Sequence, residues 1–106
     1  MSPENLENNL ARAAELQREW NRCGFAFIAT DLETSLTFAH LALEARDNPE
    51  KRQRNRANAR KGYDSIRRFM DRLDRSTIGT AELADVDEKL LRLKSLLQEL
   101  GEELPS

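Results

Sequence analysis

The sequence predicts an all-α fold, an up-and-down bundle of about four antiparallel helices. Three observations predict it. Apolar residues recur at steps of three and four in four separate stretches. Only four glycines and three prolines occur in 106 residues. Residues that cap helices, or proline suited to a first helical position, stand before these stretches. A chain of this length supports one core, so we expect a single domain over residues 1–106.

The first predicted helix covers residues 3–22. It begins at Ser2-Pro3-Glu4, where a cap residue precedes a proline and an acidic first turn. Gly24 marks its expected end. Cys23 has no histidine neighbour that would activate it, so we expect a buried structural thiol. The apolar positions that define this helix are Leu6, Leu10, Ala13, Leu16, Trp20 and Cys23.

The second predicted helix covers residues 31–47. Thr30 and Glu33 fit a capping box, which favours a loop over residues 24–30. The alternative is a kinked helix that continues through this segment. Its apolar positions cover more than half of the helix circumference, so we expect it to contact two or more neighbours. These positions are Leu32, Leu36, Phe38, Ala39, Leu41, Ala42, Leu43 and Ala45.

Two further helices are predicted over residues 49–75 and 81–100. Asn48-Pro49 starts the first, whose core stripe is Ala59, Tyr63, Ile66, Met70 and Leu73. The last follows a Thr80 cap and carries an unbroken heptad pattern. That seam either packs inside the monomer, which we favour, or contributes to a homodimer. The heptad positions are Leu83, Val86, Leu90, Leu93, Leu97, Leu100 and Leu104.

Charge is distributed unevenly although the formal net charge is only -2. Residues 49–75 hold ten basic and four acidic side chains, whereas the rest of the chain holds seven basic and fifteen acidic ones. We expect these basic side chains to form a ridge that faces solvent. The ridge is either simply solvated, paired with an acidic protein surface, or bound to a phosphate backbone. No aromatic residue for base stacking lies on this ridge, which disfavours nucleic acid. The basic ridge is Arg54, Lys61, Arg68, Arg72 and Arg75.

A polar cluster is predicted where the 31–47 and 49–75 helices meet. If these helices form an antiparallel hairpin about Asn48, His40 lies at the level of Arg56, and Glu44 lies at the level of Arg52. We favour ordinary ion pairs at a hairpin end, each worth little when exposed. The alternative is a small anion pocket beside the histidine.

His40 is the only histidine and lies on the polar side of its predicted helix. In this one feature the chain resembles histidine phosphotransfer domains, which are four-helix bundles with a single exposed reactive histidine. The resemblance implies that His40 is a phosphoryl acceptor. The family carries lysine and glycine three and four residues later, where this chain has Leu43 and Glu44. A glutamate there would repel a phosphoryl group.

Catalysis, cofactors and metal ions are not expected. One histidine and one cysteine do not make the usual zinc sites, and four glycines do not make an elaborate nucleotide loop. The start MSPENLENNL lacks signal-peptide features and no apolar run reaches about 20 residues, so we expect a soluble, cytoplasmic protein. The function predicted is a small non-catalytic protein–protein interaction module that forms a homo-oligomer, with a dimer favoured. Nucleic-acid binding along residues 49–75 and histidine phosphotransfer are the alternatives.

Overall fold

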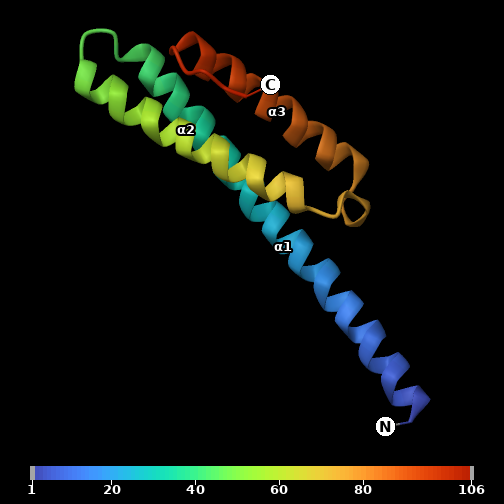
Figure 1. Ribbon diagram of the computed structural model, residues 1–106. Coiled ribbons are helices and arrows are strands. Elements are labelled where there is room, and N and C mark those ends of the chain that lie inside the picture. Colours follow the sequence, from blue (N-terminus) through green and yellow to red (C-terminus); the bar gives the residue numbers. More distant parts are fainter. Residues whose placement is uncertain (1, 106) are drawn as a thin grey trace.

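The computed structural model describes residues 2–105, and this part of the chain is helical without any β-strand (Figure 1). It contains three α-helices rather than the four expected. The first two predicted helices are one continuous helix. The elements are α1 (Pro3–Glu44), α2 (Pro49–Arg72), the short 3-10 helix η1 (Arg75–Thr77) and α3 (Thr80–Glu99).

The predicted break over residues 24–30 is wrong, and the disfavoured alternative of a continuous helix is the one observed. Gly24 serves a close helix contact instead of a helix stop, since an added Cβ would lie 2.8 Å from the Phe69 ring. The Thr30 hydroxyl does not cap a helix, because it donates a hydrogen bond to the Ala26 carbonyl at 3.3 Å. Phe25 and Ile28 are buried in the core, so packing favours a helix through this apolar segment.

The predicted helix starts at Ser2 and Asn48 are confirmed. The Ser2 hydroxyl accepts a hydrogen bond from the Asn5 amide at 3.4 Å, and the Asn48 side chain accepts one from the Lys51 amide at 3.1 Å. Other boundaries differ from prediction. α1 ends at Glu44 and α2 ends at Arg72. The predicted Thr80 cap is wrong, because Thr80 is the first residue of α3 and Gly79 is the N-cap, with no side-chain hydrogen bond to the helix end.

One core lies where all three helices meet. α1 contributes six buried apolar side chains between Phe25 and Ala42. α2 contributes the predicted stripe except Leu73, which is only partly buried. At Gly62 of α2 the helices approach so closely that an added Cβ would lie 1.9 Å from the Ser35 hydroxyl. The α3 seam packs inside the chain, as we favoured, with Val86, Leu90, Leu93, Leu97 and Leu100 buried.

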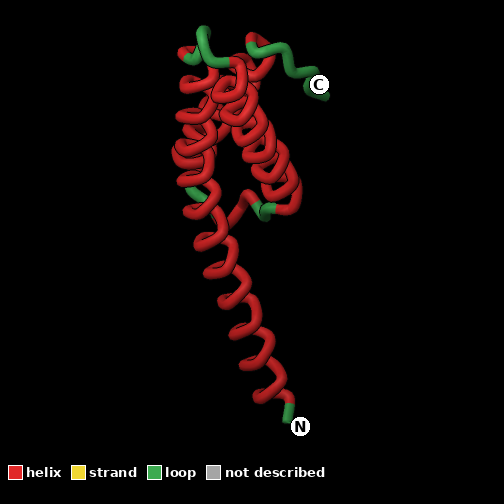
Figure 2. The backbone as a smooth tube through the Cα atoms, turned by 90° about the vertical axis from the view of Figure 1, so that its left-hand side faces the viewer, coloured by secondary structure: helices red, strands yellow, loops and turns green. Residues whose placement is uncertain are grey.

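Helix length explains the elongated shape of 69 × 24 × 21 Å. At 1.5 Å per residue, the 42 residues of α1 span about 63 Å, whereas α2 and α3 span about 36 and 30 Å. The shorter helices therefore cover only the C-terminal half of α1. Figure 2 shows the N-terminal half standing alone. We call residues 3–20, all of which are exposed, the arm.

Candidate interaction surface

The arm carries an apolar face that no other segment of residues 2–105 covers. Six large hydrophobic side chains are exposed in residues 2–105, and five of them lie on α1. Their exposed fractions run from 52% at Leu6 to 73% at Trp20. The sixth is Leu91 of α3, 66% exposed. The five on α1 are Leu6, Leu10, Leu16, Trp20 and Phe27.

These side chains follow a coiled-coil repeat. Positions 6, 10, 13, 17, 20, 24 and 27 alternate steps of four and three, and only Gln17 and Gly24 interrupt the apolar series. Leu16 and Cys23 lie beside the seam. A repeat of this kind presents one side of a helix to a second helix. The arm therefore has the pattern of a helix with a missing neighbour.

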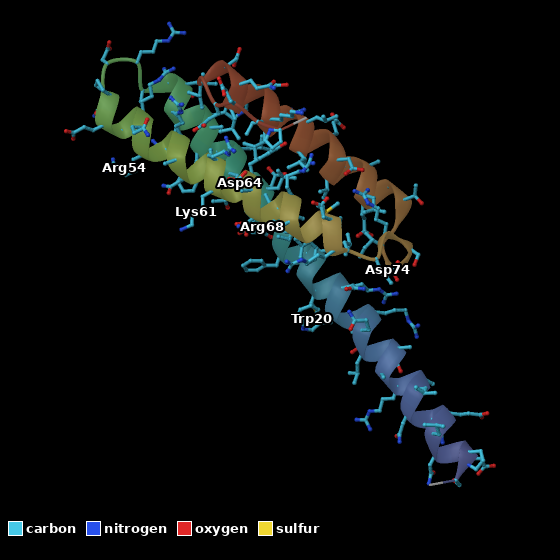
Figure 3. The ribbon with its side chains drawn as sticks, viewed as in Figure 1. Trp20, Arg54, Lys61, Asp64, Arg68 and Asp74 are labelled. Carbon is cyan, nitrogen blue, oxygen red and sulfur yellow. The ribbon has the colours of Figure 1, made fainter. Side chains whose placement is uncertain are left out.

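A groove lies where the arm joins the core. It has a volume of about 700 Å³ between α1 and the end of α2. Figure 3 places Trp20 on α1 just beyond the end of α2. We call it the Trp20 groove; its aromatic and charged lining includes Trp20, Phe27 and Asp31 of α1, with Arg68, Phe69 and Arg72 of α2. The groove thus combines apolar rings with two basic side chains.

Charge differs between the two ends of the arm. Its free end carries Glu4 and Glu7 and no basic side chain before Arg12. The rest of the arm is balanced, with two acidic and two basic side chains. At the far end, the Trp20 groove adds two arginines and one aspartate, so the excess positive charge there comes from α2.

The basic ridge is exposed along α2. Arg54, Lys61, Arg68 and Arg72 are exposed, and none of them forms an ion pair with an acidic side chain in the described part of the chain. Figure 3 shows the first three along one edge of the helix. Arg75 lies in η1 and binds Asp87 at 3.3 Å.

The four residues of the predicted polar cluster are not joined to one another, and the Glu44–Arg52 ion pair that we favoured is absent from the described residues. His40 and Glu44 are exposed, Arg52 and Arg56 are half-buried, and no hydrogen bond or ion pair within residues 2–105 joins any two of the four. Arg56 instead binds Glu102 at 3.0 Å.

The C-terminal segment, which sequence reasoning did not place, binds this arginine. Arg60 also binds Glu102 at 3.3 Å and donates a hydrogen bond to the Glu103 carbonyl at 2.9 Å. Gly101, with a φ of 93°, forms a Schellman turn in which the Glu102 amide donates to the Leu97 carbonyl at 2.9 Å. The glycine after an apolar helix signalled this turn, but not the arginines that it would meet.

One ion-pair cluster joins α1 to α3. The Lys89 ammonium binds Glu33 of α1 and, at 3.0 Å, Asp85 of its own helix. Hydrogen bonds to Glu33 and then Asp85 raise the pKa of Lys89 above its usual 10.5.

Cys23 is exposed, which corrects the expected buried thiol. Across residues 2–105, no three His, Cys, Asp or Glu side chains gather closely enough to hold a metal ion. None of the helices in that range is both long enough and apolar enough to cross a membrane. No family model, curated protein sequence or solved structure matches the chain, so a function has to be inferred from these surfaces.

Proposed function

We propose that the protein is a self-association module in which the arm pairs with the arm of a second copy. The observation that carries this proposal is the apolar heptad face of the arm from Leu6 to Trp20, which is helical and exposed, with the exposed Phe27 farther along the same helix. Isolated helices in water gain little stability from propensity alone, and amphipathic ones are stabilised chiefly by packing. A second helix on this face would supply that packing.

The apolar area available suits a dimer of moderate affinity. Complete burial of a large apolar side chain contributes about 1.5–3 kcal/mol. The five exposed side chains on α1 have between 52% and 73% of their maximal surface accessible to solvent. Complete burial of ten such residues in a symmetric pair gives about 9–18 kcal/mol, which is of the same order as the about 4–15 kcal/mol that association costs.

The other candidate dimer surface is weaker. The heptad seam of α3 is occupied by the core of its own chain. Leu91 is the one large apolar side chain of α3 that is well exposed in the described residues. A dimer through α3 would therefore bury much less apolar area than a dimer through the arm.

Light scattering over a concentration series tests the proposal. The 12.2 kDa chain should approach twice that mass as concentration rises. Leu10→Glu places a charge on the apolar face and should keep the protein monomeric, with its helicity retained. Asn8→Glu is the matched control, because it adds the same charge on another face of the arm. A single-chain mass for the unmodified protein at every concentration would contradict the proposal.

Nucleic-acid binding along α2 is the second candidate function. It is favoured by the four basic side chains of the ridge that are exposed and form no ion pair with a described acidic side chain. Contacts to phosphates would make affinity fall steeply with salt. Titration with duplex DNA and single-stranded RNA at two salt concentrations tests it. Binding that is lost in an Arg54→Glu, Lys61→Glu double variant would support this function, and no binding at low salt would contradict it.

A further inference from the structure

We infer that the two arms pair antiparallel, so that the acidic free end of one copy lies in the Trp20 groove of the other. This inference rests on the proposed self-association and specifies its geometry. The segment that occupies the groove is residues 4–10, with Leu6 and Leu10 on its apolar side and Glu4 and Glu7 as its charges.

Charge complementarity gives the direction. An antiparallel pair brings the acidic free end, with Glu4 and Glu7, to the end of the partner's α2. There Arg68 and Arg72 line the groove without an ion pair to any described acidic side chain. A parallel pair would place the two acidic free ends together and leave these arginines without an acidic neighbour from the arm. It would also bring the two globular halves to the same end, where they compete for space.

The heptad repeat gives the register. Antiparallel helices that interleave their seams around a two-fold axis near Glu15 bring Leu10 to the level of the partner's Trp20. Ala13 then lies level with the partner's Gln17, and Leu16 flanks the seam beside the partner's Leu16. The small side chain of Ala13 near the axis allows the two helices to approach closely.

The same register fills the groove. Leu6 reaches the level of the partner's Gly24, the position that the Phe69 ring approaches. The groove has Trp20 at its near end and Phe27 farther along α1. Leu10 has the Glu7 carboxylate one turn before it in the arm. The apolar side chain fits the rings of the groove, and the carboxylate fits its two arginines. This arrangement covers Trp20 and Phe27, the two most exposed large hydrophobic side chains of the described chain.

Disulfide trapping tests the direction. In this register Asn9 lies beside the partner's Cys23, which is exposed and is the only cysteine. Asn9→Cys should therefore give a covalent dimer under mild oxidation, with peptide mapping showing a bond between positions 9 and 23. Asn8→Cys is the matched control, since it adds a thiol one residue away on another face and should cross-link much more slowly. A dimer of the unmodified chain joined rapidly through Cys23 to Cys23 would overturn the antiparallel arrangement.

Charge exchange tests the groove. Glu4→Arg/Glu7→Arg should weaken homodimerisation about tenfold, and so should Arg68→Glu/Arg72→Glu, because each leaves like charges facing each other. Mixing the two variants should restore opposite charges at both docked ends, with the native pairing at one end and the reversed pairing at the other, and should yield a heterodimer tighter than either homodimer. Homodimers of unchanged affinity in both variants would overturn the groove assignment while leaving self-association intact. A protein that is monomeric without any substitution would instead overturn the proposed function itself.

Discussion

The two halves of α1 have the same kind of sequence and different surroundings. Residues 21–44 include eight buried positions, whereas residues 3–20 include none. Both halves place apolar side chains at steps of three and four. The difference lies in the reach of the other helices, because α2 ends at Arg72, three residues after the Phe69 ring that meets Gly24, and no later described element continues along the arm. Apolar periodicity thus identifies a face that can be buried, and the lengths of the neighbours decide whether the chain buries it.

The largest expected effect is a difference in stability loss between a substitution in residues 21–44 of α1 and a substitution in the arm. Leu32→Ala removes a side chain with no exposed area from the covered half and should lower the free energy of unfolding by about 3 kcal/mol. Leu10→Ala in the arm, where the side chain is 62% exposed, should change it by less than about 0.5 kcal/mol in dilute monomer. Urea denaturation followed by circular dichroism measures both.

The same pair of variants sharpens the comparison at high concentration. There, Leu10→Ala should raise the dissociation constant of the dimer, whereas Leu32→Ala should act on folding. Equal losses of stability for the two variants in dilute protein would show that the arm packs against its own chain, contrary to the structure.

The next effect concerns two glycines of the helix contacts. Gly62→Ala should destabilise by about 2 kcal/mol, since its Cβ would overlap the hydroxyl of the buried Ser35. Gly24→Ala, near the boundary of the arm, meets only the edge of the half-buried Phe69 ring and gains about 1 kcal/mol of helix propensity, so its net change should be small.

A double variant checks the cause at Gly62. Removing the hydroxyl by Ser35→Ala should recover more than half of the loss, because the nearest overlap is with that oxygen. Independent, additive losses in thermal or urea unfolding would show that the close helix approach is not what requires the glycine.

The helical class, the core stripes of residues 59–70 and 86–97, and the starts at Ser2 and Asn48 could all be predicted from local pattern. The continuity of the helix at Gly24 could not be predicted, because the sequence does not distinguish a glycine that ends a helix from one that makes room for an aromatic ring. The exposed basic ridge followed from the helical period. The Trp20 groove did not, since it joins residues of two helices that lie more than 30 positions apart in the sequence.

A smaller effect should come from the C-terminal segment, which binds two arginines of α2 through Glu102. Glu102→Gln weakens the contacts to Arg56 and Arg60 and should cost about 1 kcal/mol, because these ion pairs are only partly exposed. Glu103→Gln is the matched control, since that residue contributes its backbone carbonyl to Arg60. Thermal unfolding of both variants should show a shift only for the first, and equal shifts would contradict a specific role for Glu102.

The smallest effect should come from Lys89, whose exposed ion pairs tie the covered half of α1 to α3. The pKa of Lys89 is raised in the folded state by hydrogen bonds to Glu33 and then Asp85. A raised pKa means that the stabilisation is fully present below pH 10.5 and is lost as pH rises through the folded value. Lys89→Met should therefore lower stability slightly at pH 7 and remove the part of the alkaline loss that is due to this group. Because the pairs are exposed, 0.5 M salt should reduce the difference between variant and parent at pH 7. A difference that persists unchanged at high salt would show that the methylene stem of Lys89, and not its charge, connects the two helices.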